Sequence, residues 1–263
     1  MPSGLLEIRA AVLYYAGVKS ARLNEIFSSV QGEGPWIGER QVFVRFEGCD
    51  MRCRYCDTPA SRTASASCMA QTSPGAPVAD ERVPNPVSAA LLSGLCARLA
   101  ADGPARSTIS LTGGEPLLQL EFLAEWLPLA KKHHRVYLET SGIHFDAMQA
   151  IRDAVDVVSM DFKLPSATGL RPFWDEHERF LYATANAGLF VKAVVTGDTD
   201  RADILVSARL IAGRDTSIPL VLQPASGPLA PAPEMLLAFQ DAALGILPDV
   251  RVIPQAHKML GVR

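Results

Sequence analysis

Three cysteines stand close together in the segment GCDMRCRYCDT, where Cys49, Cys53 and Cys56 follow the spacing C-x3-C-x2-C. Thiolates at this spacing can hold three corners of a cubane iron–sulfur cluster from a single loop. The fourth iron then has no protein ligand and can take a small molecule. A structural zinc site is the alternative, and it needs a fourth ligand, for which Cys68 is the candidate. Spacing alone favours a [4Fe–4S] cluster over zinc and over unrelated thiols.

A second motif, LTGGEPLL at Leu111–Leu118, joins two glycines and a carboxylate to the end of an apolar run. Gly113 and Gly114 let the backbone approach a ligand closely, because they carry no side chain. Glu115 offers a carboxylate for an ammonium group. The motif by itself also fits an ordinary turn into a helix that starts at Pro116. Together with the cysteine segment it favours a ligand site.

Composition narrows the class of protein. The chain has 263 residues, 48% hydrophobic and 20% charged, as in a globular protein. The net charge of −3 argues against a broad nucleic-acid or membrane surface, while a local basic site still suits a small anion. Glu7 and Arg9 interrupt the apolar N-terminal residues, so we predict no signal peptide, no membrane span and a cytoplasmic protein. Five cysteines, an odd number, make a poor disulfide framework.

The elements that must position these motifs alternate between short β-rich runs and longer helical patterns. The expected strands are Gln41–Phe46, Thr108–Leu111, Arg135–Leu138, Val155–Met160, Leu189–Val195 and Leu220–Gln223. The expected helices are Pro86–Ala101, Leu117–Lys132, Phe145–Asp153, Phe173–Ala187 and Arg201–Ala212. This alternation predicts an α/β fold with a mostly parallel sheet and helices outside it. Six strands are too few for a closed barrel, so we expect a partial β/α barrel with its chemistry at the carboxyl ends of the strands.

Residues 60–85 read ASRTASASCMAQTSPGAPVADERVPN, which is rich in Ser, Ala, Pro and Thr and has no helical or strand period. We expect a mobile loop or insertion here. No second domain boundary is evident, so residues 1–263 are predicted to form a single domain that carries this insertion.

The cysteine spacing after a first strand, followed by LTGGEPLL, resembles the radical S-adenosylmethionine superfamily. The resemblance implies a [4Fe–4S] cluster on Cys49, Cys53 and Cys56, whose free iron chelates S-adenosylmethionine. Cys68 and Cys96 are then bystanders.

Further segments make the resemblance more specific. LNEIFSSVQGEGPWIGERQVFVRFEGCDMRCRYCDT (Leu23–Thr58) and RVIPQAHKMLGVR (Arg251–Arg263) are similar to the two ends of the 7-carboxy-7-deazaguanine synthase family. ETSG, SMDFKLPSATG and LQPAS lie between them in the expected order. The resemblance implies a lyase of queuosine and 7-deazapurine biosynthesis, which converts 6-carboxy-5,6,7,8-tetrahydropterin to 7-carboxy-7-deazaguanine and ammonia. It also implies a 5′-deoxyadenosyl radical that takes a hydrogen from C6 of the pterin, and Mg2+ at the substrate carboxylate.

Residue roles follow from matching positions. The substrate is expected at Val30, Gln31, Gly32, Glu33, Arg45, Thr112, His257 and the main-chain carboxylate of Arg263. Arg45 has the strand parity of Phe43 and Glu47, so the three should share a face. Mg2+ is expected at Thr58, with Asp57 nearby. S-adenosylmethionine is expected at Gly114, Glu115, Glu139, Ser141, Ser159, Asp161, Lys163, Gln223 and Pro224.

Two rival readings stay open at this point. A glycyl-radical activating enzyme shares the cysteine spacing, but it has no need of VQGEG or PQAHK. A zinc-stabilised binding protein without enzymatic activity is the second rival. The resemblance further implies a homodimer and an electron donor such as flavodoxin. The remaining histidines match no motif and are expected at the surface or at helix ends: His133, His134, His144 and His177.

Overall fold

The computed structural model describes residues 19–74, 80–100, 106–184 and 187–263. The N-terminal segment, for which no signal peptide is predicted, lies outside the described residues, as do residue 101 of the first expected helix and residues 185–186 of the fourth. The single domain over residues 1–263 therefore stays a prediction.

A ten-stranded sheet forms the centre of the fold, in the order β12-β11-β10-β9-β8-β7-β3-β2-β4-β5. From β3 to β12 all neighbours are parallel, whereas β2 pairs with β3, and β4 with β5, in the antiparallel sense. The strands span β2 Leu23–Val30, β3 Arg40–Phe46, β4 Ser67–Gln71, β5 Asp80–Pro84, β7 Thr108–Gly113, β8 Arg135–Thr140, β9 Val157–Phe162, β10 Gly188–Val195, β11 Leu220–Pro224 and β12 Val250–Val252. Two-residue strands β1 (Ser20–Ala21) and β6 (Val87–Ser88) pair separately.

The mostly parallel sheet confirms the expected fold class, but the strand count of six is wrong. All six expected strands are present, and β1, β2, β4, β5, β6 and β12 are additional. The expectation of a mobile loop over residues 60–85 is wrong for Ser67–Gln71 and Asp80–Pro84, because β4 and β5 pair there in the antiparallel sense, whereas the insertion stays a prediction. Cys68 and Ala70 on β4 and Val83 on β5 reach the core. These apolar residues are small and few, so they leave almost no period in the sequence.

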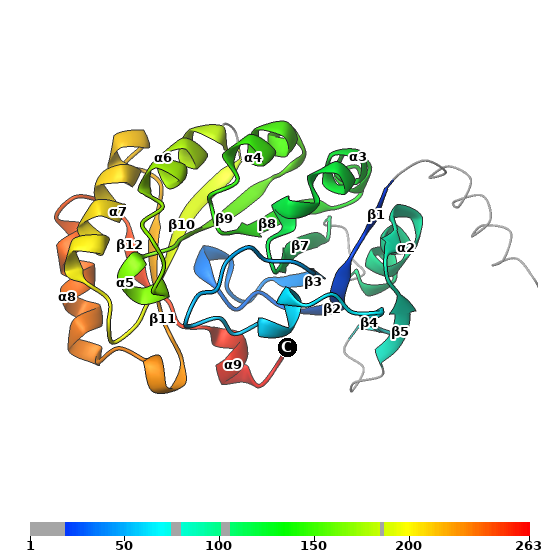
Figure 1. Ribbon diagram of the computed structural model, residues 1–263, viewed down its shortest axis with the longest axis horizontal. Coiled ribbons are helices and arrows are strands. Elements are labelled where there is room, and N and C mark those ends of the chain that lie inside the picture. The colour runs from blue at the N-terminus through cyan, green and yellow to red at the C-terminus, as the bar shows by residue number, and fades with distance from the viewer. Residues whose placement is uncertain (1–18, 75–79, 101–105, 185–186) are drawn as a thin grey trace, which may run out of the picture.

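Helices cover the convex side of the curved sheet, where α3, α4, α6, α7 and α8 follow one another in Figure 1. The helices span α2 Ala89–Leu99, α3 Leu120–Ala130, α4 Phe145–Ile151, α5 Pro165–Thr168, α6 Trp174–Ala183, α7 Arg201–Arg214, α8 Pro233–Leu244 and α9 Ala256–Leu260. Their apolar faces bury Trp126, Phe180 and Ile211 against the sheet. The five expected helices are therefore present with shorter or shifted ends, and α5, α8 and α9 are additional. Among the described residues, no helix is long and apolar enough to cross a membrane.

A small apolar cluster fills one end of the concave side of the sheet. Tyr137, Val157, Phe190 and Val221 form a separate buried cluster, against which Trp36 packs from the 3-10 turn η1, Gly34–Trp36. Within this turn Gly34 adopts a φ of +65°, and a Cβ there would lie 2.5 Å from the Phe190 ring. The segment between β2 and β3 thus crosses the concave face of the sheet and leaves the carboxyl ends of the strands open.

Candidate active site

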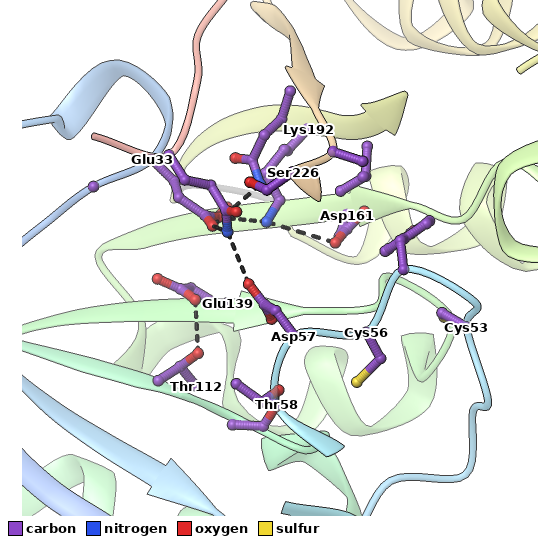
Figure 2. A pocket seen from close by; sticks show the side chains of 18 of the residues that line it. Glu33, Cys53, Cys56, Asp57, Thr58, Thr112, Glu139, Asp161, Lys192 and Ser226 are labelled. Carbon is purple, nitrogen blue, oxygen red and sulfur yellow. Dashed lines mark hydrogen bonds and ion pairs between the residues drawn. The ribbon is translucent and has the colours of Figure 1, made fainter. Parts of the chain in front are cut away.

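A cavity of about 680 Å³ lies at the carboxyl ends of the strands. Figure 2 shows side chains from distant segments converging on it, from Glu33 near the start of the described chain to Ser226 after β11. The lining includes every site residue predicted from the sequence except Glu115: Val30, Gln31, Gly32, Glu33, Arg45, Cys49, Cys53, Cys56, Thr58, Thr112, Gly114, Glu139, Ser141, Ser159, Asp161, Lys163, Gln223, Pro224, His257 and Arg263.

The cysteine loop leaves β3 and forms one side of this cavity. Cys49, Cys53 and Cys56 are free thiols of intermediate exposure. Arg52 donates to the carbonyl of Cys49 at 2.8 Å, which fixes the loop from within. Burial raises the pKa of the Cys49 and Cys53 thiols. The three cysteines share a cavity wall, as a cluster with one open iron requires.

Cys68 and Cys96 lie away from this cavity. Both are fully buried in the core, Cys68 in β4 and Cys96 in α2. Cys68 is therefore not placed to complete a zinc site with the loop cysteines. Among the described residues no group of three His, Cys, Asp or Glu side chains is arranged to hold a single metal ion.

The GGEP turn packs directly on the cysteine loop. Gly113 has a φ of +111°, and a Cβ on Gly114 would lie 1.9 Å from the carbonyl oxygen of Gly48. The amide of Glu115 donates to that same oxygen at 2.7 Å. No side chain fits between the two segments, so the glycines set the contact of the turn with the cysteine loop.

Glu115 itself is buried behind the cavity wall. Its Oε1 accepts from the Thr140 hydroxyl at 2.8 Å and from the Leu117 amide at 3.1 Å, and its Oε2 accepts from the Ser141 amide at 2.8 Å. The carboxylate thus orders the turn after β8, which carries Ser141 into the cavity. Direct contact of Glu115 with S-adenosylmethionine stays a prediction.

His177 is not a surface residue, and the expectation for it is wrong. It is fully buried on α6, with its ring stacked on Phe162 at a centroid distance of 4.5 Å. Its Nε2 accepts from the Lys163 amide and its Nδ1 contacts the Gly142 carbonyl, both at 2.9 Å. Burial lowers the pKa of His177 to about 4, so the ring is neutral with its proton on Nδ1. Its position among Phe173, Trp174, Phe180 and Leu181 on an apolar helix face is the signal that sequence reasoning missed.

Glu33 stands at the centre of a buried charge network that Figure 2 shows in one view. Its Oε2 lies 2.5 Å from Nζ of Lys192, and its Oε1 accepts from Gln255 at 2.6 Å and from Gln223 at 3.1 Å. Burial opposes ionisation of Glu33, but Lys192 and the amide donors hold its pKa below the usual range. Sequence reasoning missed Lys192 and Gln255, although a lone lysine in the apolar strand LFVKAVV is a visible signal.

Glu139 lies on the same side of the cavity as Gln31 and Thr112. It accepts from Thr112 at 2.7 Å and from Gln31 at 3.1 Å. Burial, with the negative charge of Glu33 nearby, raises the pKa of Glu139. These contacts group Glu139 with residues expected to hold the substrate, whereas the sequence placed it with S-adenosylmethionine.

Arg45 reaches the cavity from β3. Its Nε donates to Glu25 at 2.7 Å, and its guanidinium lies 5.6 Å from the centre of the Phe27 ring. The terminal nitrogen atoms make no hydrogen bond within the described part of the chain, so they remain available to a carboxylate. Phe43 also lines the cavity, as its parity predicted. Glu47 does not, because β3 ends at Phe46 and Glu47 turns to Arg22.

The C-terminal segment closes the cavity beside η1. The Ala256 amide donates to the Gly32 carbonyl at 2.9 Å, and a Cβ on Gly32 would lie 2.0 Å from Nδ1 of His257. Ser29 donates to the main-chain oxygen of Arg263 at 2.8 Å. Residues more than 220 positions apart in sequence therefore share one wall.

Several polar atoms of the lining have no partner in the part of the chain that the structure describes. Ser141 Oγ, Asp161 Oδ1 and Gln223 Oε1 are buried and make no hydrogen bond among the described residues. Buried polar atoms are normally paired, so these three fit a polar ligand. With three free thiols in the same cavity, the donor set suits a cluster and S-adenosylmethionine together.

Comparison with known proteins agrees with this chemistry. The family model of the radical SAM superfamily matches residues 43–197. A 7-carboxy-7-deazaguanine synthase from Geobacter sulfurreducens is 42% identical over 92% of this chain and 97% of its own length. The synthase from Archaeoglobus fulgidus is 36% identical over 92% and 99%. Neither relative is named as an activating enzyme or a zinc protein.

A solved structure shares the fold. QueE from Escherichia coli aligns with a TM-score of 0.57 at 20% sequence identity, covering 92% of this chain and 97% of that one. Radical SAM enzymes use a [4Fe–4S] cluster and S-adenosylmethionine, for which the cavity has suitable residues. The chain belongs to the 7-carboxy-7-deazaguanine synthase family, a group of lyases within the radical SAM superfamily.

Proposed function

We propose that the protein converts 6-carboxy-5,6,7,8-tetrahydropterin to 7-carboxy-7-deazaguanine and ammonia. The observation that carries this proposal is the convergence of two residue groups on one cavity. We assign Ser141, Ser159, Asp161 and Lys163 to S-adenosylmethionine and call them the cofactor wall. We assign Gln31, Glu33, Arg45 and His257 to the pterin and call them the pterin wall. When bound, the cluster and S-adenosylmethionine supply the organic radical.

The pterin wall suits a carboxylated pterin. Arg45 offers a planar guanidinium, whose rigid fork matches a carboxylate. Glu33 and Gln31 offer acceptor oxygens to the donor-rich edge of the ring. Glu139, whose pKa is raised by burial and by Glu33, is suited to hold a proton near the substrate. The main-chain carboxylate of Arg263 is proposed as a further contact.

Mg2+ is proposed at Thr58, which follows the cysteine loop and lines the cavity. The hydroxyl donates weakly to the Gly113 carbonyl at 3.4 Å, which leaves its oxygen lone pairs for a cation. Asp57 is held by Gln255 at 2.9 Å and by Lys258, so it orients the loop beside this position. One hydroxyl is a weak ligand, so substrate oxygens and water complete the octahedral shell. We further propose a homodimer that receives electrons from a flavodoxin, on the strength of the family alone.

An anaerobic assay of the reconstituted enzyme tests the function. The reduced protein is incubated with S-adenosylmethionine, Mg2+ and the carboxy-tetrahydropterin, and 7-carboxy-7-deazaguanine and ammonia are measured by mass spectrometry and an enzymatic ammonia assay. We expect equal amounts of both products and none with Cys53→Ala. Cleavage of S-adenosylmethionine without either product would overturn the proposal.

A further inference from the structure

Lys192 lies between two carboxylates that belong to different walls of the cavity. It stands on β10 directly opposite Asp161 of β9 in the parallel register. Its Nζ is 2.5 Å from Oε2 of Glu33 and 3.6 Å from Oδ2 of Asp161. Figure 2 shows Glu33, Lys192 and Asp161 in one row across the cavity. The ammonium therefore contacts the pterin wall and the cofactor wall at the same time.

Each carboxylate leaves a different position for a ligand. Oδ2 of Asp161 contacts both lysines, with Nζ of Lys163 at 2.8 Å and Nζ of Lys192 at 3.6 Å. Oδ1 of Asp161 is buried and has no hydrogen-bond partner among the described residues. Oδ1 can accept from a hydroxyl of S-adenosylmethionine. Glu33 accepts from Lys192, Gln223 and Gln255, so the position of the Lys192 ammonium helps to set how this carboxylate meets a pterin.

We propose that Lys192 is a positioning residue that makes binding of S-adenosylmethionine and binding of the pterin mutually favourable. A ligand that immobilises Asp161 also immobilises the ammonium, and through it Glu33, so the second ligand has less left to order. Gln223 also donates to Glu33, but it makes no hydrogen bond to Asp161 among the described residues. The ammonium of Lys192 attracts both carboxylates at once, so Lys192 carries most of the coupling.

This inference rests on the proposed function, and its test is a binding experiment without turnover. The cluster-loaded protein is kept oxidised and anaerobic, and S-adenosylmethionine affinity is measured by equilibrium dialysis with and without saturating 6-carboxy-5,6,7,8-tetrahydropterin. We expect the pterin to tighten S-adenosylmethionine binding about fivefold or more in the native protein, and S-adenosylmethionine to tighten pterin binding by the same factor. In Lys192→Met we expect both factors to fall below about twofold.

Matched variants separate coupling from simple damage. Lys163→Met removes the other lysine on Asp161 but has no contact with Glu33 among the described residues, so it should weaken S-adenosylmethionine binding and retain the coupling factor. Lys192→Arg keeps the charge and should also retain it. If Lys192→Met does not fold, judged by iron content and melting temperature, the double variant Glu33→Gln/Lys192→Met removes both charges and should show no coupling.

The outcomes distinguish this inference from the function beneath it. Independent binding of both ligands to the native protein would overturn the role of Lys192 and leave the proposed function standing. Full coupling in Lys192→Met, or in the double variant, would overturn it as well. A native protein that binds S-adenosylmethionine but not the pterin would instead contradict the proposed function.

Discussion

The cofactor wall and the pterin wall are supported in different ways. The cofactor wall grows from consecutive strands β8 and β9, and buried residues behind it, Glu115 and His177, hold its turns by hydrogen bonds. The pterin wall instead combines the segment after β2, strand β3 and the C-terminal segment. The first and the last of these meet at Gly32 and His257. The first wall is a product of local β/α units, and the second exists only when distant segments dock. A substitution in one wall should therefore weaken binding of the ligand of that wall and leave the affinity for the other ligand unchanged.

The cysteines give the largest expected effect, because the cluster serves both walls. Cys49→Ala, Cys53→Ala or Cys56→Ala should each abolish iron binding and turnover, since the cubane loses a corner ligand. Cys68→Ala and Cys96→Ala should retain both, because these thiols lie in the core. Iron content and absorbance near 400 nm measure the cluster in each variant. Loss of the cluster in Cys68→Ala, with the cluster retained in the three loop variants, would overturn the assignment of the cluster ligands.

Paired glycine substitutions should break one wall at a time. A Cβ on Gly32 would lie 2.8 Å from the backbone nitrogen of His257, so Gly32→Ala should weaken pterin binding about tenfold or more and spare S-adenosylmethionine. Gly142 has a φ of +67°, and a Cβ there would lie 2.7 Å from the Met160 side chain. Gly142→Ala should therefore weaken S-adenosylmethionine binding and spare the pterin. Gly94→Ala on α2 meets nothing within 4 Å and is the control. Parallel losses of both ligands in either variant would refute separate walls.

Arg45→Lys sharpens the comparison without steric damage. Lysine keeps the charge but loses the planar fork, and a charge-assisted contact is worth about 1.5–3 kcal/mol. We expect pterin affinity to fall by at least about tenfold while S-adenosylmethionine affinity stays unchanged. Dialysis with each ligand measures the split, and an equal loss of both would indicate misfolding or a misplaced site.

His177→Phe tests the cofactor wall from behind. Phenylalanine keeps the stacking on Phe162 but leaves the Lys163 amide unpaired, which should weaken S-adenosylmethionine binding about tenfold and pterin binding much less. His177→Gln should restore part of the affinity, because its amide can again donate and accept. Phe180→Leu perturbs the same helix without touching either turn, and it should leave S-adenosylmethionine affinity intact. A loss in that control equal to the loss in His177→Phe would reduce His177 to a packing residue.

The smallest expected effect is a pH dependence of stability. The pKa of His177 is about 4 in the folded protein and near 6.5 when unfolded, so the unfolded state takes up the proton first. The contribution of His177 to the free energy of unfolding is fully present above about pH 6.5 and is lost as the pH falls toward 4. Between pH 7 and pH 5 this loss amounts to about 2 kcal/mol. His177→Gln should remove this part of the decline, which denaturant unfolding at both pH values measures. Equal declines in the two proteins would contradict the assignment.

The contrast between the walls also explains what sequence could predict. Strands β7 to β11 are apolar runs beside helices, buried on both faces, and each was predictable. β4, β5 and β12 are short, and their few apolar residues give no period. Cavity residues were predictable where a sequence motif coincides with the end of a strand, as it does at Asp161 in β9 and at Gln223 in β11. The contacts of Lys192, Gln255 and His177 depend on which distant segments meet, which no local pattern contains.

The ends of the sheet have a consequence for self-association. β5 and β12 are its outermost strands in the described chain, and the sheet does not close on itself. β5 carries Asp80, Glu81 and Arg82 and ends at Pro84, while β12 is three residues long with Arg251 at its centre. Charges, proline and short length all hinder pairing of an exposed strand with another chain. Both edges of this open ten-stranded sheet are therefore poor templates for pairing with a strand of another chain.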